Sequence, residues 1–146
     1  MAKAARAIII ENGKILLMHR DKYGSQYYTL VGGRMNDGET LEQSLVREIK
    51  EETGLTVIRA RLVFTEAHPA PYNEQYIYLC EVGPHDDIAI HDSTEEGEMN
   101  KLGMNIHRPT WCNLRAFENL SFRTPQLQAA ILKAFKEGFP SEPKKL

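Results

Sequence analysis

Carboxylates gather in one short segment of the chain, directly after a glycine-rich turn. Glu48, Glu51 and Glu52 are spaced three and four residues apart, which places them on one side of a helix. Like charges this close repel one another, and a bound divalent cation would relieve the repulsion. All three side chains offer oxygen, and no cysteine or histidine lies between residues 33 and 55, so the pattern favours Mg²⁺ or Mn²⁺ over zinc. The segment therefore indicates a metal held against phosphate.

Helix signals bracket these carboxylates. Thr40 is followed three residues later by Gln43, which has the form of a capping box and predicts a helix that begins near Thr40. Gly54 fits the left-handed residue that ends a helix. Apolar residues recur every four positions and predict a stripe that faces the core, at Leu41, Leu45 and Ile49.

Two further features adjoin the carboxylates. Arg47 lies one turn before Glu51, where it can form an ion pair that orients a carboxylate. Gly32 and Gly33 precede the helix, and paired glycines let a backbone carbonyl or amide approach a metal or a phosphate closely. The plain alternatives are a helix face of ordinary salt bridges and a simple tight turn.

The segment also follows the spacing G-x5-E-x7-R-E-U-x-E-E-x-G-U, in which U is an aliphatic residue. The matching residues are Gly33, Glu39, Arg47, Glu48, Ile49, Glu51, Glu52, Gly54 and Leu55. On these residues the chain resembles the Nudix hydrolase family. The resemblance implies an α/β fold, an α/β/α sandwich with a mixed β-sheet. It also implies hydrolysis of a diphosphate linkage in a nucleoside diphosphate joined to another group, with Mg²⁺ or Mn²⁺ as cofactor.

The resemblance assigns roles to the motif residues. It implies that Gly32, through its carbonyl, and three carboxylates bind the metal: Glu48, Glu51 and Glu52. The predicted catalytic set is Arg47 with the same three glutamates, and Glu48 or Glu52 is placed to take a proton from the attacking water. Many members add a catalytic glutamate outside the motif. The candidates are Glu95, Glu96 and Glu98. The alternative to a catalytic role is that they belong to an acidic loop exposed to solvent.

Four residues are predicted to contact the substrate: Arg20, Gly33, Glu39 and Tyr72. Arg20 follows an apolar strand, where the family often uses a basic residue to contact the phosphate or the base of the substrate. The alternative, with equal weight, is an arginine that is simply exposed to solvent at the end of a strand. Tyr72, Tyr76, Tyr78 and Trp111 could stack a nucleobase. The alternation of Tyr76 and Tyr78 fits one packed face of a strand more simply.

Departures from the family pattern leave the substrate open. Val31 stands where proline is common, and Asn36 stands where glutamate is frequent. Pro69 and Pro71 lie near the place where ADP-ribose-cleaving members carry proline, whereas Tyr72 lies near the place where dinucleoside-polyphosphate members carry tyrosine. The signatures for coenzyme A and NADH cleavage are not evident.

Composition sets the class of protein. A chain of 146 residues is predicted to form a single domain spanning residues 1–146. A formal net charge of -2 with 42% hydrophobic and 26% charged residues argues against disorder and against duplex nucleic acid as a partner. Cys80 and Cys112 lie in apolar runs without metal-ligand spacing, which predicts buried reduced thiols. No signal peptide and no membrane span is evident, so we expect a soluble cytoplasmic protein.

The remaining elements are predicted from periodicity. Strands are expected at Ala5–Ile10, Lys14–Arg20, Tyr27–Val31, Thr56–Glu66, Gln75–Val82 and Trp111–Leu114. Asn12-Gly13 predicts a hairpin turn. A second helix is expected to begin at Thr124-Pro125 and to end at Gly138, with an apolar stripe at Leu127, Ile131, Leu132 and Phe135. Residues 83–108 are expected to form a functional or mobile loop, and residues 140–146 a frayed tail.

Three hypotheses for function follow. The first is a metal-dependent nucleotide pyrophosphatase that acts on a nucleoside triphosphate or a modified (d)NTP and releases monophosphate and pyrophosphate. The second is cleavage of ADP-ribose or a nucleotide sugar. Enzymes of this kind often complete their substrate pocket with residues of a dimer partner, so a homodimer is one alternative for this chain. The third is a nucleotide sensor without turnover, against which the intact motif and the lack of room for an attached DNA-binding domain argue.

Overall fold

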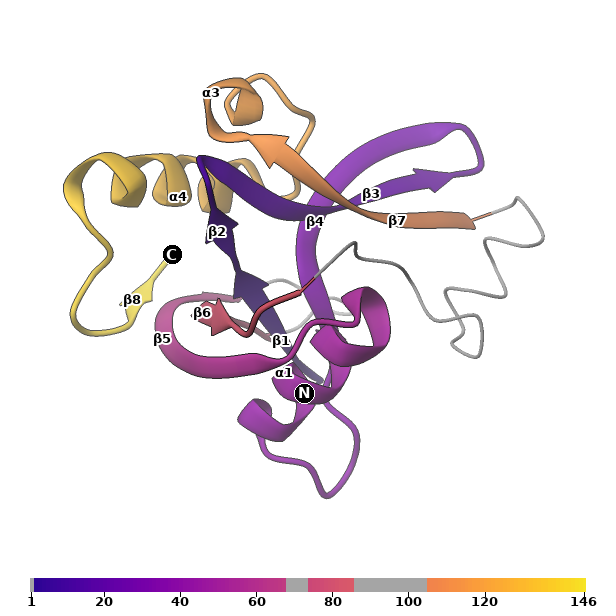
Figure 1. Cartoon of the computed structure of the whole chain (residues 1–146), viewed down its shortest axis with the longest axis vertical. Coiled ribbons are helices and arrows are strands. Elements are labelled where there is room, and N and C mark those ends of the chain that lie inside the picture. The colour runs from indigo at the N-terminus through magenta and orange to yellow at the C-terminus, as the bar shows by residue number, and fades with distance from the viewer. Residues whose placement is uncertain (1, 68–73, 86–104) are drawn as a thin grey trace.

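The computed structural model describes residues 2–67, 74–85 and 105–146, and these form a mixed β-sheet with helices on its two sides (Figure 1). The elements in chain order are β1 (Lys3–Ile8), β2 (Ile10–Glu11), β3 (Lys14–Lys22), β4 (Ser25–Arg34), α1 (Leu41–Thr53), β5 (Val57–Ala67), β6 (Glu74–Val82), β7 (Asn105–Asn113), α3 (Leu114–Phe117), α4 (Pro125–Glu137) and β8 (Lys144–Lys145). The predicted α/β fold is confirmed.

The order of the strands shows why the sheet is mixed. Along its main path the order is β2-β3-β4-β1-β6-β5-β8, and β7 also pairs with β3. The pairs β1–β6 and β5–β8 are parallel, whereas β1–β4, β3–β4 and β5–β6 are antiparallel. The central strand β1 therefore lies between β4, which carries the glycine pair, and β6.

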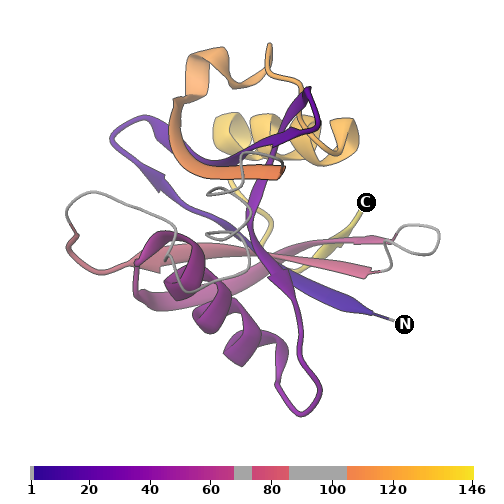
Figure 2. The ribbon, with the colours of Figure 1, turned by 90° about the vertical axis from the view of Figure 1, so that its right-hand side faces the viewer.

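Two cores lie on opposite sides of the sheet, and Figure 2 shows α1 and α4 on those opposite sides. Neighbouring strand residues alternate between them: Leu17 and Leu30 belong to the core under α4, and Leu16 and Val31 belong to the core under α1. Both cores are closed by fully buried helix residues such as Ile131. The sandwich is thus built by strand alternation.

Two tight turns shape the strands that lead to the site. Asn12 and Gly13 both have positive φ angles, of 51° and 74°, and join β2 to β3 as the Asn-Gly pair predicts. Tyr23 and Gly24 make a second such turn between β3 and β4, with φ angles of 51° and 87°. This second hairpin aligns β4 along β3 and brings the end of β4 to helix α1.

The strand predicted at Trp111–Leu114 is wrong in its bounds. Strand β7 runs from Asn105 to Asn113, and Leu114 begins the short helix α3, which was not predicted. The run is more polar than its partner β3 and contains Pro109, so its sequence pattern does not indicate a strand. Proline is nevertheless tolerated in a strand that is paired on one side, as β7 is with β3. Residues 105–108 therefore belong to the sheet, not to a loop, and residues 86–104 of the expected loop lie outside the described residues.

The C-terminal tail is ordered, contrary to the expected fraying. Strand β8 pairs in parallel with β5, and the backbone N–H of Leu146 donates to the carbonyl of Thr65 at 2.8 Å. The apolar stripe of α4 also needs correction, because Phe135 is 50% exposed while Ala134 is buried. Within the described part of the chain, no helix has the length and apolar composition needed to cross a membrane.

Candidate functional site

Helix α1 holds the predicted carboxylates, and both of its ends form as the sequence indicates. The Thr40 side chain accepts a hydrogen bond from the Gln43 backbone N–H, and the Gln43 side chain accepts one from the Thr40 N–H. Gly54 ends the helix with a φ of 79°. Leu45 and Ile49 are fully buried against the sheet. These contacts fix the rotation of the helix and hence the direction of its acidic side.

Two of the carboxylates meet the glycine pair of β4. Oε1 of Glu52 accepts a hydrogen bond of 2.8 Å from the backbone N–H of Gly32, and Glu52 is only 4% exposed. A Cβ added at Gly33 would lie 2.7 Å from the carboxylate carbon of Glu48. Glu48 and Glu52, one helical turn apart, therefore each approach one residue of the glycine pair. Gly33 leaves the space that Glu48 occupies, and its predicted contact with substrate stays a prediction.

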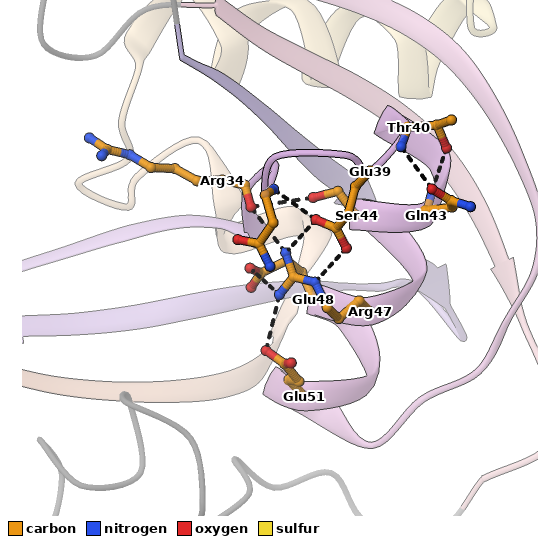
Figure 3. Close-up of polar contacts among 9 residues, drawn as sticks. Arg34, Glu39, Thr40, Gln43, Ser44, Arg47, Glu48 and Glu51 are labelled. Carbon is orange, nitrogen blue, oxygen red and sulfur yellow. Dashed lines mark hydrogen bonds and ion pairs between the residues drawn. The ribbon is translucent and has the colours of Figure 1, made fainter.

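Arg47 binds three carboxylates at once, as Figure 3 shows. Its guanidinium donates to both oxygens of Glu39, at 2.7 Å and 3.0 Å, and to Glu48 at 2.9 Å. The predicted ion pair with Glu51 is present at 3.3 Å. Hydrogen bonding to Glu39, above all, raises the pKa of Arg47. Arg47 therefore orients the acidic side chains of the motif.

Glu39 is held in the turn before the helix. Besides its two bonds from Arg47, its Oε1 accepts the backbone N–H of Asn36 at 2.7 Å. The hydrogen bonds from Arg47, and then the one from Asn36, hold the pKa of the Glu39 carboxyl below its ordinary value. The observed partners of Glu39 thus bind the loop to the helix, and its contact with substrate remains a prediction.

The three predicted metal ligands stand in different surroundings. Glu48 and Glu52 face the glycine pair, whereas the side chain of Glu51 is 44% exposed and turns to Arg47. As they stand, no three acidic, histidine or cysteine side chains in the described ranges are grouped closely enough to hold a metal ion. The chemistry of the donors nevertheless fits a hard divalent cation, because every one of them is a carboxylate or a carbonyl oxygen.

Arg6, which is not among the predicted site residues, reaches the same glycine pair from β1. Its Nη1 donates to the Gly32 carbonyl at 2.9 Å, the atom that the family resemblance assigns to the metal, and to the Leu30 carbonyl at 3.3 Å. Its Nε donates to Gln75 at 3.2 Å. Burial lowers the pKa of Arg6, against the opposing effect of the negative charges of Glu52 and Glu48. The available signal was a lone arginine in the otherwise apolar run of residues 4–10.

Arg6 also lines a pocket of about 410 Å³ between the sheet and the start of α4. Its apolar part comes from Leu30, Ile77 and Leu127. Its charged groups are Arg6, Arg20, Glu66 and Arg123. Arg20 thus faces a pocket from within β3, which extends to Lys22, and does not stand at a strand end. That placement agrees with the predicted contact of Arg20 with substrate, which stays a prediction.

The other aromatic and acidic candidates divide into two groups. Tyr78 is 3% exposed and Tyr76 packs against the same core under α1, which agrees with one packed strand face. Trp111 stacks on His85 with ring centroids 6.0 Å apart. The remaining candidates lie outside the described residues: Tyr72, Glu95, Glu96 and Glu98.

The chain is similar to known proteins both in sequence and in fold. The model of the NUDIX domain family matches residues 1–135. The NAD-capped RNA hydrolase NudC of Vibrio atlanticus (strain LGP32) is 34% identical over 70 residues, which are 48% of this chain and 26% of that protein. The chain therefore matches only about a quarter of the length of that curated relative.

Solved structures share the fold over nearly the whole chain. The E. coli ORF135 protein has a TM-score of 0.70 at 21% identity and covers 97% of this chain and 95% of its own. An ADP-ribose pyrophosphatase from Streptococcus suis 89-1591 has a TM-score of 0.62 at 20% identity, with 99% and 98% covered. At these identities the likeness concerns the fold alone.

Proposed function

The chain belongs to the Nudix family of hydrolases, and from this premise we propose that it cleaves a diphosphate linkage in a nucleoside triphosphate or a modified (d)NTP, releasing monophosphate and pyrophosphate. One observation carries the proposal. Glu48 and Glu52 lie at the glycine pair, Gly32 and Gly33. Arg6 donates to the Gly32 carbonyl and also lines the pocket, so the carboxylates and the pocket adjoin. Carboxylates with the chemistry to bind a divalent cation, beside a pocket that carries arginines, suit a nucleotide polyphosphate.

The proposed cofactor is Mg²⁺ or Mn²⁺, held by Glu48, Glu51, Glu52 and the Gly32 carbonyl. When bound, such a cation supplies charge neutralisation for the phosphate oxygens. For Glu51 this role requires that its carboxylate leave Arg47, and the exposure of its side chain allows that movement. The Gly32 carbonyl has a second lone pair beside the one that Arg6 uses.

The chain's own residues supply the rest of the proposed chemistry. Glu48 or Glu52 accepts the proton of the attacking water, since each lies at the glycine pair where the diphosphate must be held. Arg47 fixes Glu48 through a 2.9 Å hydrogen bond and so sets the orientation of its carboxylate. The apolar part of the pocket, at Leu30, Ile77 and Leu127, takes the nucleoside.

A second candidate is a pyrophosphatase for ADP-ribose or a nucleotide sugar. The pocket, of about 410 Å³, suits a drug-sized ligand and therefore allows this candidate as well as the first. A similar solved structure carries the name ADP-ribose pyrophosphatase, and a sequence relative the name NAD-capped RNA hydrolase. A homodimer that completes the pocket belongs to this second proposal. A sensor without turnover is the third.

Phosphate release from a panel of substrates tests these proposals, with Mg²⁺ or Mn²⁺ present. Triphosphates are followed with inorganic pyrophosphatase. ADP-ribose, nucleotide sugars and dinucleoside polyphosphates are followed with alkaline phosphatase, which attacks only their products. Glu52→Gln is compared with Glu137→Gln, an exposed glutamate at the end of α4. Turnover of triphosphates that Glu52→Gln alone abolishes supports the first proposal, and turnover confined to the other compounds supports the second. Nucleotide binding without any turnover supports the sensor.

A further inference from the structure

One side of the pocket is formed by an aromatic ring that two arginines share. The guanidinium carbon of Arg123 lies 3.7 Å from the ring centroid of Tyr27, and that of Arg20 lies 5.6 Å from it. All three residues line the cavity. They come from different elements, because Arg20 belongs to β3, Tyr27 to β4 and Arg123 to the segment before α4. The fold therefore assembles this group from distant parts of the chain.

Positive charge exceeds negative charge around the cavity. Among the described lining residues, Arg6, Arg20 and Arg123 are cationic and Glu66 is the one acid. Glu66 is 3% exposed and accepts a hydrogen bond of 2.5 Å from the Thr124 hydroxyl, which fixes it at the start of α4. The lining thus keeps an excess of cationic groups after Glu66 is counted.

Arg6 and Arg123 differ in the protein groups that contact their guanidinium groups. Arg6 donates to two backbone carbonyls and to Gln75, so its guanidinium is held by the protein. For Arg123, in contrast, no carboxylate within the described ranges lies at ion-pair distance, and its contact is the ring of Tyr27. Contact with a neutral ring positions a guanidinium without neutralising it, and the N–H groups, which lie in the plane of the guanidinium, can still donate to a ligand.

We propose that Arg123 and Arg20, beside Tyr27, bind a phosphate monoester on the nucleoside part of the substrate, away from the scissile diphosphate. The proposal rests on the proposed function and narrows its substrate class to nucleotides that carry an additional phosphate. A phosphate matches the planar fork of arginine and compensates the excess charge, which an uncharged base or sugar alone does not. The apolar residues Leu30, Ile77 and Leu127 take the nucleoside next to it.

The position of Arg6 separates this site from the place of the scissile linkage. The diphosphate must lie beside Glu48 and Glu52 at the glycine pair, and Arg6 bonds the Gly32 carbonyl there while it also lines the pocket. The pocket extends from Arg6 to the start of α4, where Arg123 precedes Pro125. Arg123 therefore lies on the far side of the pocket from the carboxylates and binds a different group from the diphosphate.

Calorimetric binding without metal tests the proposal independently of turnover. The ligands are AMP, adenosine 2′,5′-bisphosphate and adenosine 3′,5′-bisphosphate, together with the matching guanosine compounds. In the wild-type protein we expect at least one bisphosphate to bind about tenfold more tightly than its monophosphate, as one additional charge-assisted contact provides. Arg123→Gln should reduce that preference to about twofold or less, and Arg20→Gln should reduce it as well. Arg115→Gln, an exposed arginine on α3, should retain it.

Each outcome decides between the two proposals. Equal binding of monophosphates and bisphosphates, binding of neither, or a preference that survives Arg123→Gln overturns the phosphate site. Arg123 is exposed but covers the ring of the buried Tyr27, so its variant should lose this contact and keep a melting temperature within a few degrees of the wild type. Turnover of the substrate panel without a bisphosphate preference sinks this inference and leaves the proposed function standing. A bisphosphate preference without any turnover leaves the phosphate site standing and contradicts the proposed hydrolase activity.

Discussion

The backbone N–H of Gly32 donates a 2.8 Å hydrogen bond to Oε1 of Glu52 and so joins strand β4 to the last turn of helix α1. Glu52 is nearly inaccessible to solvent at 4% exposure, whereas the side chain of Glu51, one residue earlier, is 44% exposed. A buried carboxylate held by a backbone donor is placed before any ligand arrives. The two neighbouring glutamates therefore stand in different surroundings, and Glu52 is the one that the protein already holds in place.

Glu52→Gln should separate metal binding from folding. The glutamine oxygen can still accept the Gly32 N–H, so we expect the free energy of unfolding to change by about 1 kcal/mol. The lost charge should weaken Mn²⁺ binding by about tenfold or more and lower turnover by about a hundredfold. Calorimetric titration with Mn²⁺ and urea unfolding measure the two effects. Mn²⁺ affinity equal to that of Glu137→Gln would show that Glu52 is not a ligand.

The two glycines of the pair should respond differently to alanine. At Gly32, which has a φ of 127°, an added Cβ would lie 2.2 Å from the Ala5 carbonyl oxygen, and neither backbone can move aside. Gly32→Ala should therefore lower the free energy of unfolding by about 3 kcal/mol or more. At Gly33 the three atoms nearest to the Cβ all belong to the flexible carboxylate of Glu48, whose carbon would lie 2.7 Å away. Gly33→Ala should fold nearly normally but displace Glu48.

Melting temperature and turnover together check this pair. Gly33→Ala should keep a melting temperature within a few degrees of the wild type while losing most of its activity. Gly38→Ala is the control for Gly32→Ala, because Gly38 also has a positive φ, of 86°, but nothing within 4 Å of the added Cβ, so it tests the backbone strain without the clash. If Gly33→Ala retained full activity, the close approach of Glu48 to the backbone would have no role in the reaction.

Much of this arrangement follows from local sequence signals. The capping box of Thr40 and Gln43, the αL residue Gly54 and the buried Leu45 depend on residues near one another in the chain, and all three predictions are confirmed. The ion pair of Arg47 with Glu51 is confirmed for the same reason, since it spans one helical turn. Short-range geometry repeats from protein to protein, and a sequence pattern captures it.

The features that the sequence did not reveal depend on contacts between distant segments. Arg6 meets the glycine pair only because β1 pairs with β4, and Arg123 meets Tyr27 only because the start of α4 lies over the sheet. Strand β8 forms because β5 offers an edge to the tail, where Leu146 bonds Thr65. No local propensity records these partners, so the pocket and the ordered tail required the folded structure.

The cysteines should react slowly, and in a defined order. Burial raises the pKa of the Cys80 thiol to about 12, and burial also raises the pKa of Cys112, which is only half-buried. Because the thiolate is the reactive form, both should resist iodoacetamide at pH 8, and Cys112 should be modified first. Peptide mass analysis over time measures the order. Faster labelling of Cys80 in the folded protein would contradict its burial in the core under α1.

The bond between Glu39 and Arg47 should make stability depend on pH in the acidic range. Hydrogen bonds from Arg47 and Asn36 hold the pKa of Glu39 below its ordinary value of 4.5 in the folded protein. A carboxyl whose pKa is lower in the folded state contributes stability above pH 4.5, and this contribution is lost as the pH falls through the folded pKa.

Glu39→Gln can keep the Asn36 bond but removes the charge. Its difference from the wild type in free energy of unfolding should therefore be constant near neutral pH and shrink as the solution is acidified below pH 4.5. Urea unfolding across that range measures it, with Glu137→Gln as the control. A difference that grows on acidification would reverse the sign and show that Arg47 does not stabilise ionised Glu39.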